Sequence, residues 1–395
     1  MKERIAAGFG NNIDYEIVWN SEVIEELITR YNIRNSELDV NRVITCERDL
    51  VISILSFLKL GSGGERFVSS SEIIEQFSEK FAKKVTLGGT SVRAALAMRK
   101  LGITTALHLV TINDDVRRLL PPNCPYVCSN SHDTSYPHLI VQFDKATRVK
   151  ANDIDICAPQ ANRLIYHSDA DNIAMRLNED FADLITDAEV LLVSGFNAMQ
   201  SETLLRNRLE TVLKMMEKLP RNAVVFCEDA GYYEPRFSQI VYYTLGKRLT
   251  ILSLNEDELQ GYLNTRLDLL DVLQVKEALV NLRKLFPVPT LVVHTRHWAL
   301  AYGKDVEAFL PALKSAVTMA TTRFCFGDDF TVEQYTSVEA LPPREENARF
   351  ADALNKLSDG TICCVPVAHV EPAIPTTVGL GDAFVGGFLP ELLAR

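Results

Sequence analysis

The chain has 395 residues, of which 47% are hydrophobic and 24% charged, and these values are typical of a folded globular protein. This length allows one large domain with a smaller one, or two domains of ordinary size. The net charge of −11 disfavours nonspecific nucleic-acid binding, which depends on clustered Lys and Arg, and no apolar segment is long enough to cross a bilayer.

The eight cysteines do not have the spacing of a zinc ribbon, so we expect mostly reduced thiols. The first residues pass into a short apolar run without the hydrophobic region of a signal peptide. We therefore expect a cytoplasmic protein that acts as a monomer or a small homo-oligomer.

The N-terminal pattern predicts a strand over residues 4–9 that ends in the polar turn Gly8-Phe-Gly-Asn-Asn-Ile-Asp14. Asn12 and Asp14 alternate around Ile13, so both side chains can point the same way from an extended backbone. Such a pair is suited to hydrogen bonding with neighbouring hydroxyl groups, although Asn and Asp in a turn are more often structural.

Helical periodicity follows over residues 21–31 and 47–60, and a glycine break then leads to Glu65. The next pattern is a strand that ends in Gly88-Gly89, a helix over residues 90–101 and a strand from Thr104. Glycines at the carboxyl end of a strand in such a βαβ unit allow a ligand to approach the backbone.

Residues 124–169 are polar and strand-like, which indicates a β-rich insertion. His138 is a candidate ligand-contacting residue, with simple packing as the alternative. Arg163 is a candidate to neutralise a transferring phosphoryl group, with a surface salt bridge as the alternative.

From residue 176 onward strands and helices alternate, which predicts a doubly wound, mostly parallel sheet. Glu228 follows one strand and Asn255-Glu-Asp-Glu258 follows the next, so both should lie along one sheet edge. Their oxygens could hold Mg²⁺ against phosphates, and the alternative for the second set is an N-terminal helix cap. Residues 324–343 are expected to form a loop-rich border of a nucleotide pocket.

The stretch from Ile374 to Phe388 is a glycine-rich turn that leads into an apolar helix. Gly379 and Gly381 leave room for backbone N–H groups to converge on an anion. Asp382 is the only ionisable side chain in the stretch. It is a candidate general base that takes a proton from an attacking hydroxyl, and helix capping is the alternative.

The motif Gly379-Leu380-Gly381-Asp382 resembles the GxGD signature of the ribokinase-like sugar kinases. Further stretches occur in the order seen in ADP-dependent glucokinases and phosphofructokinases: Gly8–Asp14, Gly63–Glu65, Gly88-Gly89, Asn162-Arg163, Asn255–Glu258 and His294–His297. The resemblance implies a ribokinase-like α/β fold whose doubly wound, mostly parallel sheet carries a smaller α/β lid domain from discontinuous segments. We expect the lid at residues 10–80 and 132–172, and the large nucleotide-binding domain at residues 1–9, 81–131 and 173–395.

The resemblance also implies an ADP-dependent, Mg²⁺-requiring sugar kinase that transfers the β-phosphoryl of ADP to a sugar hydroxyl and leaves AMP. From this resemblance, the residues expected to face the sugar are Asn12, Asp14, Glu65, Gly88, Gly89 and His138. Those expected at the phosphoryl group are Arg163, Gly379, Gly381 and Asp382. Those expected to hold Mg²⁺ are Glu228, Asn255 and Glu258. Those expected beside the nucleotide are Gly379, Leu380, Gly381 and His294.

The acceptor and donor are left open. Glu65 favours glucose or glucosamine, because a carboxylate repels a sugar phosphate, whereas Lys145, Arg148 and Lys150 could serve fructose 6-phosphate. The GxGD motif is also shared by ATP-dependent kinases. A non-catalytic sugar- and nucleotide-binding regulator is the remaining alternative, because Glu228 matches the Glu of the family's HxE motif but Cys227 is expected to stand in place of its His.

Overall fold

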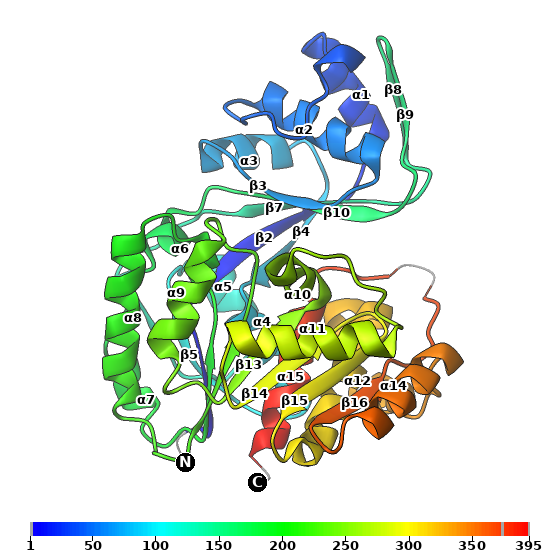
Figure 1. Ribbon diagram of the computed structural model, residues 1–395. Coiled ribbons are helices and arrows are strands. Elements are labelled where there is room, and N and C mark those ends of the chain that lie inside the picture. The colour runs from blue at the N-terminus through cyan, green and yellow to red at the C-terminus, as the bar shows by residue number, and fades with distance from the viewer. Residues whose placement is uncertain (1–2, 373–374, 394–395) are drawn as a thin grey trace.

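The computed structural model describes residues 3–372 and 375–393, and these form a larger and a smaller α/β part (Figure 1). The smaller part lies above the larger one in the figure, and the chain crosses between the two several times. Among the described helices none has both the length and the apolar character needed to span a membrane.

The larger part is built on a sheet that has nine strands within the described residues. Neighbouring strands are parallel from β6 to β14, and only β15 and β16 at one edge run antiparallel to their neighbours. In spatial order the strands are β16 (Ile362–Pro366), β15 (Trp298–Gly303), β14 (Thr290–His294), β13 (Ile251–Asn255), β12 (Val224–Glu228), β11 (Val190–Val193), β1 (Ile5–Gly8), β5 (Ala106–Leu109) and β6 (Tyr126–Cys128).

Helices cover both faces of this sheet, because its central strands are apolar on both sides. Within β11, Leu191 packs into one hydrophobic core and Leu192 into the other. The face of Leu192 is covered by α4 (Thr90–Lys100), α5 (Asp114–Leu119), α12 (Leu310–Phe326) and α15 (Leu380–Phe388). The face of Leu191 is covered by α7 (Phe181–Leu184), α8 (Glu202–Met216), α9 (Arg236–Leu245), α10 (Glu256–Leu263), α11 (Val272–Leu285) and α14 (Glu345–Leu357). The expected doubly wound, mostly parallel sheet is thereby confirmed.

The smaller part has a mixed sheet with, in the described chain, the strand order β3 (Gly64–Phe67), β10 (Asn162–His167), β7 (His138–Phe143), β2 (Asn12–Ile17) and β4 (Lys83–Gly88). Helices α1 (Ser21–Arg30), α2 (Glu47–Leu60) and α3 (Ser71–Ser78) share one hydrophobic core with a single face of this sheet. A hairpin of β8 (Arg148–Ala151) and β9 (Ile154–Cys157) extends away from the larger part (Figure 1). The remaining helices, α6 (Ala170–Ala174) and α13 (Val332–Glu339), belong to the larger part.

Two expectations about local structure differ from what is observed. Residues 83–88 were expected in the large domain, but β4 pairs with β2 and therefore belongs to the smaller sheet. Residues 324–343 were expected to be loop-rich, but they contain the end of α12 and the whole of α13. In the second case Thr331 caps α13 through its side chain, a signal that the polar composition of the segment obscured.

Candidate active site

A cavity of about 1970 Å³ lies between the two sheets. Its lining includes all the residues expected to face the sugar, the phosphoryl group, Mg²⁺ or the nucleotide, from Asn12 in the smaller sheet to Asp382 on α15. Their gathering in one place shows that the sequence motifs share a site. The role of each residue in binding or catalysis remains a prediction.

Strand alternation places the smaller part's polar residues in the cavity. On β10, Leu164 and Tyr166 pack against the helices, whereas Arg163, Ile165 and His167 face the opposite side and line the cavity. The uncovered face of the smaller sheet is therefore the one that closes the site.

The GxGD turn has the geometry of a helix start. Gly379 is the N-cap of α15 with φ of 69°, a left-handed conformation that favours glycine. Because Gly379 occupies the cap, Asp382 lies inside the first turn and is not the capping residue. Ile374, the first residue of the predicted stretch, lies outside the described residues.

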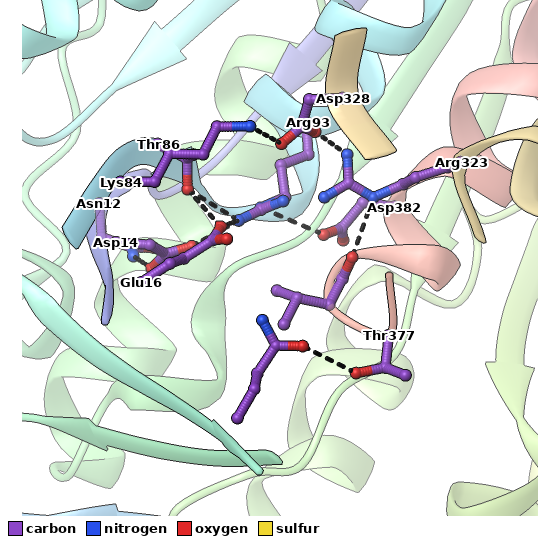
Figure 2. A network of polar contacts seen from close by, with 12 residues as sticks. Asn12, Asp14, Glu16, Lys84, Thr86, Arg93, Arg323, Asp328, Thr377 and Asp382 are labelled. Atoms are coloured by element: carbon purple, nitrogen blue, oxygen red, sulfur yellow. Dashed lines mark hydrogen bonds and ion pairs between the residues drawn. The ribbon is translucent and has the colours of Figure 1, made fainter. Parts of the chain in front are cut away.

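Two arginines that the sequence analysis did not select pack against this turn (Figure 2). Arg93 on α4 and Arg323 on α12 have 5% and 6% of their surface exposed. A methyl group on Gly379 would lie 2.9 Å from Arg93 Nη1 and 3.2 Å from Arg323 Nη2. The turn therefore needs glycine for its conformation and for the space that the guanidinium groups occupy.

These arginines belong to a chain of polar contacts (Figure 2). Asn12 Nδ2 donates to Asp14 Oδ1 at 2.6 Å, and Arg93 Nη2 donates to Asp14 Oδ2 at 2.6 Å. Arg93 Nε lies 3.9 Å from Asp382 Oδ2. Arg323 Nε donates to the carbonyl of Val378 at 2.9 Å.

Burial and charge act in opposite directions on the two guanidinium groups. Burial lowers the pKa of Arg93, but the carboxylates of Asp14 and Asp382 outweigh it, and the net shift is upward. Burial, together with the nearby Arg93 charge, lowers the pKa of Arg323 to about 10. Both groups are still cationic at neutral pH, so the turn is flanked by two positive charges.

Two histidines and two carboxylates form a second polar group on the smaller sheet's side of the cavity. His167 Nε2 lies 3.0 Å from Glu65 Oε1, and His138 Nε2 lies 3.1 Å from Asp169 Oδ2. Burial raises the pKa of Glu65, but the contacts with His167 and His138 outweigh it and leave it lowered. Burial lowers the pKa of His138, but its bond to Asp169 and the nearby carboxylates leave it raised. Glu65 is therefore ionised at neutral pH.

A third polar group lies where β12, β13 and β14 end. His294 Nε2 is 2.9 Å from Glu228 Oε1, and the His294 ring stacks on Phe384 with centroids 4.5 Å apart. Burial raises the pKa of Asp229 to about 6 and, with the Asp229 charge, raises the pKa of Glu258 well above its ordinary value. This edge concentrates carboxyl groups in a buried place, where each disfavours the ionisation of its neighbours.

The motif Asn255-Glu-Asp-Glu258 forms a capping box at the start of α10. Asn255 Oδ1 accepts from the N–H groups of Asp257 and Glu258, and Glu258 Oε2 accepts from Asn255 N–H at 2.8 Å. The capping alternative is therefore observed. The side-chain oxygen of Asn255 caps the helix, and Oε1 of Glu258 makes no bond in this box.

The interpretation of Cys227 requires a correction. In an HxE spacing the residue two before Glu228 is Phe226, and Phe226 packs 5.4 Å from the ring of Phe388. Cys227 is buried in the core on the other face of the sheet. The residue that supports Glu228 through its imidazole is His294, on a different strand, so the motif's missing His does not leave Glu228 without support.

The residues at this edge fit a divalent cation. Glu228 Oε2 is buried and has no hydrogen-bond partner within the described chain. Residues 3–372 and 375–393 hold no cluster of three or more His, Cys, Asp or Glu that could bind a metal unaided. Mg²⁺ commonly uses one or two carboxylates together with water and substrate phosphates, which agrees with both observations.

The basic residues that were considered for a sugar phosphate lie elsewhere. Lys145, Arg148 and Lys150 are not among the residues that line the cavity, and Arg148 Nη2 pairs with Asp155 Oδ2 at 2.8 Å on the hairpin. Arg163 does line the cavity, close enough to Glu65 to lower its pKa.

Comparison with known proteins agrees with this geometry. The model of the ADP-specific phosphofructokinase/glucokinase conserved region matches residues 3–389. An ADP-dependent glucokinase from Bos taurus is 27% identical over 222 residues, which are 53% of this chain and 44% of the bovine protein. The matched part thus spans less than half of that relative.

Solved structures share the fold. A phosphofructokinase from Pyrococcus horikoshii OT3 with AMP has a TM-score of 0.78 at 18% identity, covering 100% of this chain and 99% of that one. A last common ancestor of ADP-dependent phosphofructokinases from Methanosarcinales has a TM-score of 0.75 at 16% identity, covering 100% and 95%. The match of the family model over nearly the whole length shows that this chain belongs to the ADP-specific phosphofructokinase/glucokinase family.

Proposed function

We propose that the protein is an ADP-dependent, Mg²⁺-requiring kinase that phosphorylates glucose or a glucose-like sugar. The observation that carries the proposal is the arrangement around one cavity. Asp382 and the glycine turn lie on one side, and the hydroxyl-binding candidates Asn12, Asp14 and Glu65 lie on the other. An acceptor held by the smaller sheet would thus face a base and an anion-binding turn.

In the proposed reaction Asp382 accepts the proton of the sugar hydroxyl as its oxygen attacks the β-phosphorus of ADP. A new sugar O–P bond forms and the bond from the β-phosphorus to the bridging oxygen of ADP breaks, which releases AMP. The N–H groups of the turn from Gly379 to Gly381 stabilise the charge on the transferring group. The Arg163 guanidinium adds positive charge from the smaller sheet.

Glu228 and Glu258 are the residues that would hold Mg²⁺, and Asn255 contributes by fixing Glu258 through the capping box. The cation, when bound, supplies neutralisation of nucleotide phosphate charge. His294 keeps the Glu228 carboxylate in place for this purpose.

The choice of acceptor rests on the charges near the smaller sheet. Glu65 is ionised and lines the cavity, so it favours a neutral hydroxyl or an amine over a phosphate group. The alternative basic cluster lies outside the cavity. Fructose 6-phosphate is the second candidate acceptor, because the Arg163 guanidinium lines the cavity without an ion pair among the described residues.

The test is phosphoryl transfer with Mg²⁺ from ADP and from ATP, in parallel, to glucose, glucosamine, fructose 6-phosphate and ribose. AMP and sugar phosphate formed with ADP and glucose or glucosamine support the proposal. Turnover with ATP alone refutes the donor, and turnover with fructose 6-phosphate alone refutes the acceptor.

Replacement of Glu65 tests the acceptor assignment at the residue level. A hydrogen bond to a charged group is worth about 1.5–3 kcal/mol, so Glu65→Gln should raise the KM for glucose about 10- to 100-fold. Glu72→Gln, on the exposed first turn of α3, is the matched control and should leave the KM unchanged. An equal KM in both variants would remove Glu65 from the acceptor site.

A further inference from the structure

We propose that Arg93 is a positioning residue that joins the acceptor-binding carboxylate Asp14 and the base Asp382 into one charged unit. The inference rests on the proposed function and adds to it a residue that none of the recognised motifs contains. Arg93 lies on α4, after the glycine pair Gly88-Gly89. It is the one cationic residue among the buried residues of this helix, and the others are small, hydroxylated or apolar.

The first argument is the position of the guanidinium between the two carboxylates. Its Nη2 lies 2.6 Å from Asp14 Oδ2 and 3.5 Å from Glu16 Oε1, and its Nε lies 3.9 Å from Asp382 Oδ2. Asp14 and Glu16 are on β2 of the smaller sheet, whereas Asp382 is on α15 of the larger part. One side chain therefore spans the boundary across which substrate and base must be aligned (Figure 2).

The second argument is rigidity. The Arg93 side chain has 4% of its surface exposed, and its Cδ and Nη1 lie against the Gly379 turn. Asp14 is fixed from its other side, because Asn12 Nδ2 donates to Oδ1. A planar guanidinium with several fixed donors can hold groups at set angles, whereas the ammonium of lysine acts as a single point of charge.

The third argument is charge balance. Charged groups from several elements surround the Arg93 guanidinium. The smaller sheet contributes Asp14, Glu16 and Lys84. The end of α12 and the turn after it contribute Arg323 and Asp328, α15 contributes Asp382, and the Glu228–His294 pair lies against Gly381. Without Arg93, Asp14 and Asp382 lose the cation that they share.

The consequence for the reaction is geometric. Proton transfer requires the base within hydrogen-bond reach of the acceptor hydroxyl, and small displacements cost large factors in rate. If Asp14 holds the sugar and Asp382 takes its proton, the bridge through Arg93 sets their separation.

The experiment compares Arg93→Gln, Arg93→Lys and Arg93→Ala with Arg99→Gln, a matched control in the last turn of the same helix. The kcat and KM of sugar phosphorylation are measured, and sugar affinity and the thermal midpoint are measured separately. We expect Arg93→Gln to lower kcat/KM at least 100-fold. Arg93→Lys should recover less than a tenth of the lost activity, and Arg99→Gln should match the wild type.

Chemical rescue separates positioning from simple structural support. The space left in Arg93→Ala should admit guanidinium ion, and millimolar guanidinium should raise its kcat/KM at least tenfold, whereas tetramethylammonium should not. Arg93→Gln within threefold of the wild type overturns the inference. So does a loss of activity in Arg93→Ala that guanidinium does not rescue, because that pattern shows a structural role only. A wild-type protein that transfers phosphate to no acceptor refutes the proposed function and this inference with it, whereas an active wild type leaves the variants to decide the inference alone.

Discussion

Replacement of Asp382 by Asn is the most direct test of the proposed chemistry. The substitution keeps the shape of the side chain and removes its ability to accept a proton. Asp382 lies in the first turn of α15 and its side chain has 20% of its surface exposed, so an amide fits the same space.

The size of the effect follows from the usual contribution of a general base. General base catalysis contributes about 10²- to 10⁴-fold, and each factor of ten corresponds to about 1.4 kcal/mol of activation free energy. We therefore expect kcat to fall by that factor, which corresponds to a rise of about 3–5 kcal/mol in the activation free energy. Arg93 keeps its contact with Asp14 at 2.6 Å, so the free energy of unfolding should change by less than about 2 kcal/mol.

The assay is formation of AMP and sugar phosphate under single-turnover conditions, with ADP affinity and the unfolding midpoint measured on the same preparation. Asp329→Asn is the matched control, because its carboxylate lies 3.7 Å from Lys84 in the same region and its side chain is 90% exposed. Retention of more than a tenth of the wild-type rate by Asp382→Asn, with ADP affinity unchanged, would refute the base assignment.

Two further predictions concern other parts of the protein. Removal of the imidazole that supports Glu228, in His294→Ala, should raise the Mg²⁺ concentration for half-maximal activity about 10- to 100-fold, whereas His297→Ala in the same loop should not, and equal metal curves would exclude the supporting role. His108 is buried, and burial lowers its pKa to about 3. Below about pH 6.5 the unfolded chain therefore binds a proton at His108 that the folded protein does not bind. Stability is therefore full above that pH and should fall by about 1.4 kcal/mol per unit as pH drops from 6.5 toward 3, a slope that His108→Gln should lack in urea unfolding at stepped pH.

The sequence predicted the alternating elements of the larger sheet well because strong local signals mark them. Helix α2 begins and ends at the predicted residues, and Gly61 closes it in a left-handed conformation with φ of 64°. The membership of β4 was missed because strand pairing is a long-range property. Lys83–Gly88 could equally have preceded α4 in the larger sheet, and only its pairing with Asn12–Ile17 decides the matter.

The motif residues of the site were predicted, whereas the residues that connect them were not. Arg93 and Arg323 are buried in helices, where an arginine is usually exposed. The carboxylate that pairs with Arg93 is Asp14, on a distant strand, whereas Arg323 pairs with Asp328 in the turn after its own helix. A signal was present for Arg93, since its neighbours Val92, Ala94 and Ala95 are all apolar. His167 and Asp169 lacked a comparable signal, because their partners Glu65 and His138 are remote in sequence.

The strand order of the two sheets also determines when the protein can fold during synthesis. Ile5 in β1 pairs with Val190 in β11, and Asp14 in β2 pairs with His138 in β7. At about 5–20 residues per second, the ribosome needs roughly 10–40 s to deliver β11, one of the strands that pair with β1. Before β11 is made the larger sheet is incomplete, whereas the described strands of the smaller sheet, of which β10 is the last in the chain, have all been made. The active-site cavity, which needs both sheets, can therefore form only late in translation.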